Sequence, residues 1–343
     1  MRLRRLYGPG GHRTMHATRL LATGDIRTVN LPVPTPGPGE VLVRVLAAGI
    51  CGTDRHLFKG EFPCAPPVTL GHEFSGEVAV TGDGVTLALG TRIACDPNIA
   101  CGACDACLRG RVNLCARNVA IGIHRDGGLA DYAVIPAHRA LPIGDLDPHH
   151  AAFAEPLACT LHGLDLGAPR PGERVLVIGG GVIGLLAVQL AASAGANVTL
   201  LTRDPGKRDL AQRIGASQTA GTESEARALL GPGADLVVEC AGVAQTVEMA
   251  PRLASAGGRV VVLGVLPKGE QVRIEPFDLL VREISLIHSF INPFTQARAI
   301  QLLRDGQIDV APLVSRVIRL SEAAHAIANP APAGEVKVLV IPG

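Results

Sequence analysis

The sequence predicts an α/β protein with two domains: a doubly wound parallel sheet and a smaller, mostly β domain. Three observations carry this prediction. Strands alternate with helices after Leu166, a glycine-rich turn Gly179-x-Gly181-x-x-Gly184 follows an apolar strand, and four cysteines cluster within 15 residues in the first half. A chain of 343 residues is long enough to bury a core in each of two domains.

Composition and charge narrow the functional classes. The formal net charge is +1, so nothing indicates a nucleic-acid partner or an acidic membrane surface. Nine cysteines without a recognisable signal peptide favour reduced thiols, metal binding and a cytoplasmic location. Residues 1–14 hold four arginines and no apolar core, and we expect them to be a disordered extension ahead of Met15.

The first predicted domain, residues 15–157, consists of short strands and irregular loops. Residues 30–40 hold four prolines and two glycines and cannot be helical. Residues 41–49 then alternate and are rich in β-branched side chains, which is typical of a strand. Further short strands are expected at 77–81 and 132–135. This domain carries all of the candidate metal ligands.

A lobe within this domain, residues 95–116, contains Cys101-x2-Cys104-x2-Cys107-x7-Cys115. Four thiolates so close together can surround one Zn²⁺ tetrahedrally and leave no open position, which predicts a structural site. An iron–sulfur cluster is a weaker alternative, because ferredoxin runs have a shorter last gap followed by proline. Disulfides would need an oxidising compartment.

The second predicted domain, residues 158–292, contains a run without charged residues from Val175 to Thr202. The run is long enough to span a bilayer, but three consecutive glycines interrupt it and several polar side chains would face lipid. A buried strand at 175–178, a glycine turn and a helix through Ala194 explain it better. Later strands are expected at 197–202, 236–240, 259–263 and 284–288. Residues 293–343 are expected to form a linking helix and to return to the first domain through a strand at 337–341.

The glycine turn predicts a nucleotide site. Its glycines permit a tight turn and let the backbone approach a pyrophosphate at the helix N-terminus. The next strand ends in Thr202-Arg203, where NAD sites usually carry an acidic residue. Arg203, with Thr202 and Lys207, can bind a 2′-phosphate, which favours NADP. The alternative is NAD, with Arg203 a surface charge and Asp204 on the ribose.

A second metal site is indicated by Cys51 and His72, which suit zinc as a thiolate and an imidazole. The third protein ligand is Glu73 or Glu155, and the remaining position would hold water or substrate. Such a zinc lowers the pKa of a bound hydroxyl, so that the alcohol carbon can release hydride to a nicotinamide. Thr53 and His56 would relay the hydroxyl proton to water. The alternative is that neither takes part in catalysis, Thr53 being a turn residue and His56 a surface imidazole.

Together these motifs resemble the zinc-dependent medium-chain alcohol dehydrogenase family from Met15 to Gly343. The resemblance rests on Gly71-His72-Glu73, Cys51-Gly-Thr-Asp-x-His56, the four-cysteine lobe and the glycine turn. It implies a GroES-like catalytic domain, a Rossmann coenzyme domain, two zinc ions per chain, and a homodimer or homotetramer. The expected coenzyme-binding residues are Gly179, Gly181, Val182, Ile183, Gly184, Thr202, Arg203, Lys207, Cys159 and Val265.

Within that family the chain is similar to the polyol (sorbitol-like), threonine and butanediol dehydrogenases. Glu155-Pro156-Leu157 matches the polyol pattern, in which the glutamate contacts the zinc or its water, and Cys159 falls beside the nicotinamide face. Thr202-Arg203 departs from the acidic residue of most polyol dehydrogenases. The resemblance therefore implies oxidation of a secondary alcohol of a polyol, with NADP expected. The alternatives are an NAD-dependent butanediol or threonine dehydrogenase, and a non-catalytic nucleotide-binding module.

Overall fold

The computed structural model describes residues 14–343, so the expected N-terminal extension lies almost wholly outside the described residues. The chain divides into two compact units, which we describe separately. Unit 1 comprises the described part of Met1–Glu155 together with Val314–Ala331 and Lys337–Gly343. Unit 2 comprises Pro156–Leu313 and Pro332–Val336. The C-terminal segment thus contributes to both units.

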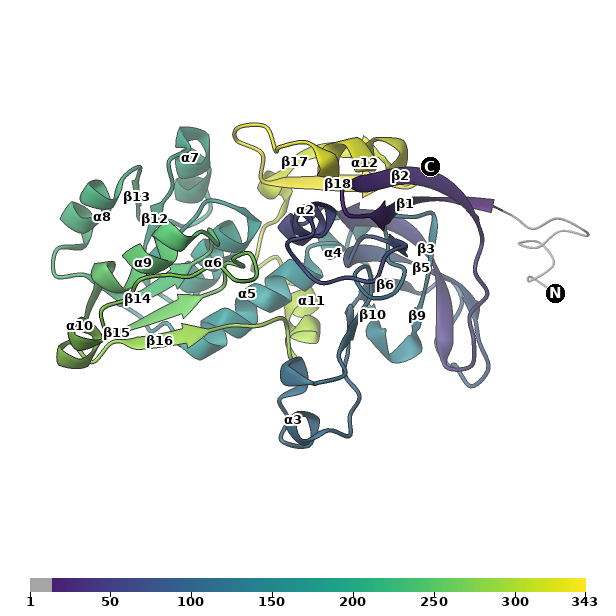
Figure 1. Ribbon diagram of the computed structural model, residues 1–343, viewed down its shortest axis with the longest axis horizontal. Coiled ribbons are helices and arrows are strands. Elements are labelled where there is room, and N and C mark those ends of the chain that lie inside the picture. Colours follow the sequence, from purple (N-terminus) through teal and green to yellow (C-terminus); the bar gives the residue numbers. More distant parts are fainter. Residues whose placement is uncertain (1–13) are drawn as a thin grey trace, which may run out of the picture. The chain divides into compact units, whose positions relative to one another are not determined.

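Unit 2 is built on six parallel strands in the order β13-β12-β11-β14-β15-β16 (Figure 1). This is the Rossmann strand order 3-2-1-4-5-6. All strands are parallel, but successive strands are added on one side of β11 up to β13 and on its other side from β14 onward, so the order in which the chain fills the sheet reverses between β11 and β14. Ligands of such sheets bind at the carboxyl ends of the strands that flank this reversal. The strands are β11 (Arg174–Ile178), β12 (Asn197–Leu201), β13 (Gln218–Ala220), β14 (Ala234–Glu239), β15 (Ala254–Val262) and β16 (Ser285–His288).

Helices connect these strands because parallel strands need crossovers, and the helices bury the apolar faces of the sheet. The first crossover helix, α6, has an almost wholly apolar sequence and is buried along most of its length. Leu176, Val237 and Val260 from three neighbouring strands form the centre of the unit's core. The helices are α5 (Ala154–Gly167), α6 (Val182–Ser193), α7 (Pro205–Arg213), α8 (Glu223–Leu230), α9 (Ala244–Leu253), α10 (Pro276–Val281) and α11 (Gln296–Arg304), followed by the 3-10 turn η3 (Ala311–Leu313).

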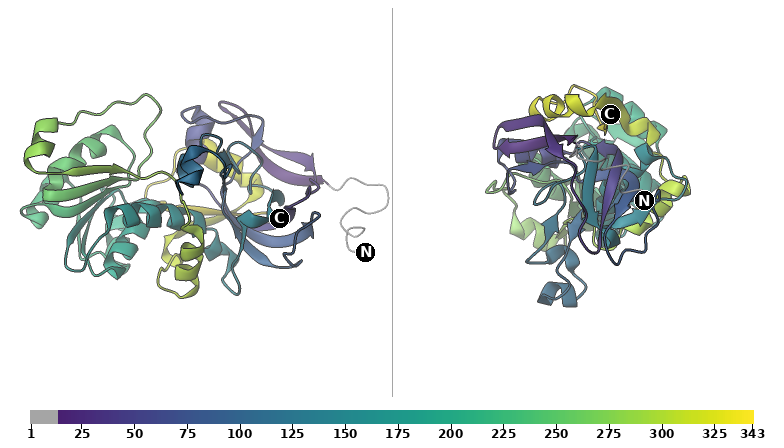
Figure 2. Two further views of the ribbon diagram at one scale, coloured as in Figure 1. Left: turned by 90° about the horizontal axis from the view of Figure 1, so that it is seen from below. Right: turned by 90° about the vertical axis from the view of Figure 1, so that its right-hand side faces the viewer.

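Unit 1 is a mostly β unit. Its main sheet runs β10-β6-β5-β3-β18-β17, with β9 also paired to β3, and a smaller sheet runs β2-β1-β4. A lobe carrying α3 projects from the strands of this unit, as the views in Figures 1 and 2 show. The strands are β1 (Thr14–Ala22), β2 (Asp25–Pro32), β3 (Glu40–Gly49), β4 (Val68–Thr69), β5 (Glu73–Thr81), β6 (Arg92–Cys95), β7 (Asn98–Ile99), β8 (Val119–Ala120), β9 (Tyr132–Pro136), β10 (Ala140–Pro142), β17 (Val314–Arg319) and β18 (Lys337–Ile341).

Short helices join the strands of unit 1. They are α2 (Gly52–Lys59), α3 (Asp105–Leu108), η1 (Val112–Leu114), η2 (Ala137–Arg139), α4 (Pro148–Ala151) and α12 (Leu320–Ala328). The core of the unit joins distant parts of the chain, since Leu57, Ile93 and Val340 belong to one buried cluster. The last strand, β18, pairs antiparallel with β3, which carries the C-terminus into the main sheet.

The structure confirms each strand predicted from residue patterns, and the predicted linking helix corresponds to α11. It adds elements that the sequence analysis did not propose, among them β1, β2, α5, α12 and β13, and starts β15 at Ala254, five residues before the predicted start. The uncharged run that could have spanned a bilayer forms β11, α6 and β12. No helix among residues 14–343 is long and apolar enough to cross a membrane.

Replacing Gly184 by alanine is expected to destabilise unit 2 by roughly 1–3 kcal/mol. A Cβ there would lie 1.9 Å from the carbonyl oxygen of Gly179, which forces α6 away from β11. Gly181 provides the matched control, since a Cβ there would meet nothing within 4 Å. Thermal unfolding should show a lower midpoint for Gly184→Ala alone, and equal midpoints for the two variants would contradict the packing argument.

Candidate active site and coenzyme site

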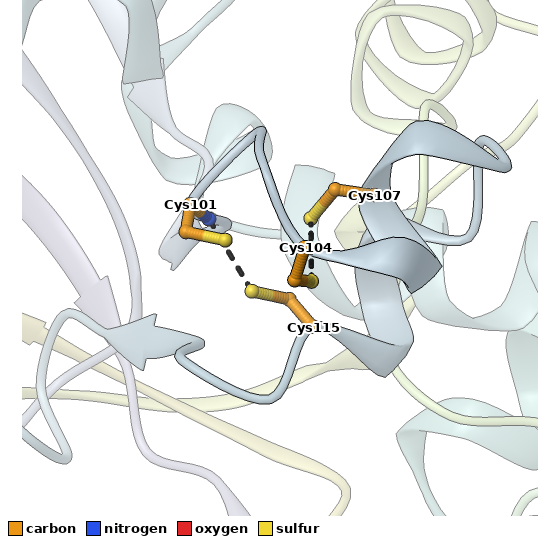
Figure 3. A group of neighbouring side chains, drawn as sticks. All are labelled: Cys101, Cys104, Cys107 and Cys115. Atoms are coloured by element: carbon orange, nitrogen blue, oxygen red, sulfur yellow. Dashed lines mark hydrogen bonds between the residues drawn. The ribbon is translucent and has the colours of Figure 1, made fainter.

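The lobe of unit 1 brings its four cysteines together (Figure 3). Their sulfur atoms all lie within 4.8 Å of one another, and the pairing of β7 with β8 closes the base of the lobe. Zinc–sulfur bonds of 2.3 Å in a tetrahedron place the sulfurs about 3.8 Å apart, which this group can reach. None of the nine cysteines, all of which lie among the described residues, forms a disulfide. The four residues are Cys101, Cys104, Cys107 and Cys115.

Electrostatics in the lobe also suit a cation. Backbone N–H groups of Ala103 and Cys104 lower the pKa of Cys101 to about 5. Burial and the neighbouring sulfurs raise the pKa of Cys107 to about 12. The guanidinium of Arg117 donates to Cys101 Sγ at 3.3 Å. Thiolates this close repel each other unless a metal neutralises them, so the donor set fits a closed Zn²⁺ site.

The second metal group lies in unit 1 at the start of helix α2. Cys51 is the N-cap of this helix, and its sulfur accepts a hydrogen bond from Thr53 N at 3.4 Å. The carboxylate of Asp54 in turn accepts a hydrogen bond from Cys51 N at 2.8 Å, which completes a capping box. This arrangement places the thiol at the positive end of the helix dipole. Burial and the carboxylate of Glu73 nevertheless raise the pKa of Cys51, so the thiolate needs a cation beside it.

His72 and Glu73 reach the same point from the other side, at the beginning of β5. Ligand atoms of Cys51, His72 and Glu73 lie within 4.8 Å of one another. His72 Nδ1 lies 3.7 Å from Asp54 Oδ1, and neither atom has a hydrogen-bond partner among the described residues. A carboxylate beside one ring nitrogen typically orients a metal-ligating histidine through the other, so Nε2 is the ligand atom this geometry leaves free.

The charges around His72 fit a metal cation. Burial alone would lower the pKa of His72, yet Cys51, Asp54 and Glu155 raise it well above its ordinary value. Glu155 is buried and close enough to act on His72 electrostatically, but it is not one of the three residues whose ligand atoms converge. The structure thus brings Glu73 to the donor set and holds Glu155 beside it. A thiolate, an imidazole and a carboxylate are the ligands of catalytic zinc.

The two predicted relay residues lie on one face of α2. Thr53 and His56 are three residues apart, which makes them neighbours on a helix surface. His56 Nδ1 lies 2.7 Å from Glu61 Oε2, a partner that the sequence analysis did not propose. An ionised Glu61 keeps the proton on Nδ1, so Nε2 remains able to accept one. The His56 side chain is 29% exposed, which gives it access to water.

The coenzyme site of unit 2 begins where β11 ends. Gly179 has φ +106°, and a Cβ there would lie 2.9 Å from Ala241 N, so only glycine fits this turn. Gly181 is the N-cap of α6 and makes no side-chain cap. The first N–H groups of α6, those of Val182, Ile183 and Gly184, therefore lack helical partners and can bind a phosphate.

Several charged residues follow β12, and their hydrogen bonds show which of them remains available for a coenzyme. Asp204 is the N-cap of α7: its carboxylate accepts from Lys207 N at 3.1 Å, and this hydrogen bond and those from Gly334 and Gly206 lower its pKa. The guanidinium of Arg208 donates to the carbonyl oxygens of Thr202 and Arg203, at 2.9 and 3.1 Å. Arg203 is exposed and forms no ion pair with another described residue. Both Asp204 and Arg208 thus serve the backbone, and Arg203 keeps its charge available.

Glu239, at the end of β14, is a further residue that the sequence analysis missed. It is fully buried, and its carboxylate accepts from Ala241 N, Gly242 N and Thr246 Oγ1 at 2.7, 3.0 and 2.8 Å. These bonds fix the loop that contains Gly242. This loop lies against Val265, since a Cβ on Gly242 would lie 2.8 Å from the Val265 carbonyl oxygen. Cys159 lies on α5, one turn before Gly163, which packs against Leu263 beyond β15.

Comparison with known proteins shows the family of the chain. Residues 37–145 match the alcohol dehydrogenase GroES-like domain, and residues 182–305 match the zinc-binding dehydrogenase domain. The chain is 37% identical to D-altritol 5-dehydrogenase of Agrobacterium fabrum, over 90% of this chain and 94% of that protein. The chain belongs to the zinc-binding alcohol dehydrogenases. This family membership makes it an oxidoreductase with a GroES-like domain and a Rossmann domain, as the sequence predicted.

Two further relatives cover nearly the whole of this family member. Sorbitol dehydrogenase of Halalkalibacterium halodurans is 34% identical over 93% of this chain and 96% of its own length. The crystal structure of a zinc-binding dehydrogenase from Sinorhizobium meliloti, bound to NADP, is 55% identical. It superimposes with a TM-score of 0.94 and covers 96% of this chain and 100% of its own.

Two cysteine substitutions should each remove a different zinc ion from this dehydrogenase. Cys51→Ser is expected to lose the metal at α2, and Cys104→Ser the metal of the lobe, because a serine hydroxyl is a much weaker zinc ligand than a thiolate. Atomic emission should give two zinc ions per chain for the unaltered protein and one for each variant.

Cys64→Ser is the control, since Cys64 is half-buried and lies in neither metal group. It should keep both zinc ions and full turnover. Cys51→Ser should keep coenzyme binding, measured by fluorescence titration, while hydride transfer is lost. Undiminished turnover in Cys51→Ser would contradict a catalytic metal at this position.

Proposed function

We propose that this enzyme reversibly oxidises a secondary hydroxyl of a polyol or sugar alcohol, with NADP⁺ as hydride acceptor. The observation that carries this proposal is the convergence of Cys51, His72 and Glu73, with Glu155 beside them, in a chain that also has a Rossmann unit. Similarity to altritol and sorbitol dehydrogenases supports the substrate class. A non-catalytic module would not need this complete set of ligands and relay residues.

The chain's own residues divide the chemical work. When bound, zinc supplies Lewis acidity toward the substrate hydroxyl, and the nicotinamide supplies the hydride acceptor. Cys51 and His72 would hold the metal with one carboxylate, that of Glu73 or Glu155. Thr53 Oγ1 would accept the hydroxyl proton while its own proton moves on to His56 Nε2. Glu61 stabilises the imidazolium that results, and His56 then releases the proton to water.

The preference for NADP rests on the end of β12. NAD sites bind the ribose 2′-hydroxyl through an acidic side chain at this point, and Asp204 is already engaged as the N-cap of α7. Arg203 and Lys207 offer positive charge in its place, and Thr202 a hydroxyl donor. A charge-assisted hydrogen bond to the 2′-phosphate contributes about 1.5–3 kcal/mol. The similarity to an NADP-bound dehydrogenase agrees with this assignment.

The compartment follows from the thiols. Zinc needs thiolate ligands, which oxidation to disulfides would destroy. Since both metal groups depend on thiol ligands, we propose that the enzyme works in the reducing cytoplasm.

We also propose a homodimer or homotetramer assembled through unit 2. Helix α10 exposes Phe277, Leu280 and Val281, which are 68, 72 and 61% exposed. Strand β16 is the edge strand of the sheet and pairs with β15 on one side only among the described residues. Large exposed apolar groups beside an open edge favour association with a second copy. Leu280→Glu should therefore shift the mass measured by light scattering towards the monomer, whereas a monomeric unaltered enzyme would contradict the proposal.

The function is tested by initial rates of coenzyme reduction with polyols, butanediols and threonine, each with NADP⁺ and NAD⁺. We expect turnover of polyols and a higher kcat/KM with NADP⁺. Arg203→Ala should lower kcat/KM for NADP⁺ about ten- to 150-fold and leave that for NAD⁺ nearly unchanged.

Arg213→Ala is the matched control, because Arg213 is an exposed arginine in the last turn of α7, the helix that begins two residues after Arg203. It should not alter either coenzyme's kinetics. A preference for NAD⁺ in the unaltered enzyme would make Arg203 a surface charge. Turnover restricted to butanediol or threonine would replace the polyol assignment, and no turnover in a zinc-loaded, coenzyme-binding protein would favour the non-catalytic alternative.

A further inference from the structure

Lys337 is a fully buried lysine beside the candidate catalytic metal group. It is the first residue of β18 and is 1% exposed. Its ammonium group forms a short ion pair with Glu73 Oε2 and donates to the Ile50 carbonyl oxygen at 3.1 Å. It also lies 5.9 Å from the centre of the Phe153 ring. A buried ammonium is tolerated only with such partners, so the pair with Glu73 is a built feature of the site.

The main sheet reserves space for this pair. Gly49 on β3 is the cross-strand partner of Glu73 on β5 and of Leu339 on β18. A Cβ on Gly49 would lie 2.4 Å from Glu73 Oε2 and 2.5 Å from Lys337 Cε. Gly49 has no positive φ, so the need for glycine is one of space alone. Three neighbouring strands therefore position the ammonium against one particular carboxylate oxygen.

This contact limits how Glu73 can bind a metal. A carboxylate can bind through one oxygen or through both, and hydrogen bonds to a ligating carboxylate tune its strength as a donor. With Oε2 committed to Lys337, the carboxylate has one oxygen left for a cation beside Cys51 and His72. Its negative charge is also shared between the metal and the ammonium.

We propose that Lys337 is a positioning residue that holds Glu73 as a weak, one-oxygen zinc ligand and so keeps a coordination position open for the alcohol. The proposal rests on the catalytic zinc of the proposed function. It makes an unusual prediction: removing Lys337 should tighten the hold on the metal while turnover falls. A lysine that merely stabilised the fold would have the opposite effect on the metal, because its loss would loosen the ligand set.

The test uses protein with cobalt(II) at the catalytic position and zinc retained in the lobe. In Lys337→Met, both Glu73 oxygens become free, and we expect a five-coordinate metal. Its visible absorption should be weaker, because four-coordinate cobalt in a tetrahedral field absorbs most strongly. Release of the metal to a chelator should be about tenfold slower, a change of the size that outer-shell substitutions cause but opposite in sign, because the loss of the ammonium leaves more negative charge on the ligands. Lys337→Arg, which can still engage Oε2, should restore the original spectrum and release rate.

Glu73→Gln and the double variant Glu73→Gln/Lys337→Met isolate the route of the effect. If Lys337 acts through Glu73, the two proteins should have the same cobalt spectrum and the same release rate. If Lys337→Met does not fold, Lys337→Gln keeps a neutral hydrogen-bond donor in place, and the same changes are expected in smaller measure.

Two results would overturn the proposal. One is an unchanged cobalt spectrum in folded Lys337→Met, or in Lys337→Gln where it replaces that variant; the other is faster metal release from the same variant. Failure of the proposed function is distinguishable, because the unaltered protein would then bind only the lobe metal. A protein that binds cobalt normally and does not respond at Lys337 would refute the positioning role alone.

Discussion

Buried negative charge in the β core of unit 1 is the constraint around which that unit is arranged. Cys51, Asp54, Glu73 and Glu155 all act on the region around His72, and all but the half-buried Cys51 lie buried. Ionised groups removed from water are costly unless cations and hydrogen bonds compensate them. The structure provides the dipole of α2, the ammonium of Lys337 and a donor set suited to Zn²⁺. The chemistry of the enzyme and the stability of the unit thus depend on the same cations.

The need for Lys337 explains why unit 1 is not one continuous stretch of chain. The lysine must lie on a strand next to β3, where Gly49 leaves room for it, so the C-terminus has to return from unit 2. On its way back the chain forms β17 and α12, and α12 packs against β1 and β2. The final strand therefore carries Lys337 to Glu73 in addition to its pairing in the sheet.

In unit 2, charged side chains satisfy polar backbone groups at the ends of the strands. At the reversal of strand order, Gly179 ends β11 and Glu239 ends β14, and the two turns are in close contact. Glu239 satisfies the N–H groups of its own loop, Asp204 those of α7, and Arg208 the carbonyls at the end of β12. Polar groups used in this way are not available to a ligand. What remains is the unsatisfied N-terminus of α6 and the charge of Arg203, which together suit a phosphorylated dinucleotide.

The sequence by itself determined the fold of both domains, the four-cysteine lobe, the glycine turn and the choice of Cys51 and His72 as ligands of one metal site. Each of these features is carried by residues close together in the chain or by a strong local pattern. Only the tertiary structure decided which distant side chains meet there. Lys337 lies 264 positions after Glu73, and no local spacing links them. Likewise, Asp204 was a candidate for the ribose until its role as a helix cap became visible. A short motif records the ligands of a site, whereas the groups that orient and neutralise them are brought in by strand pairing and burial.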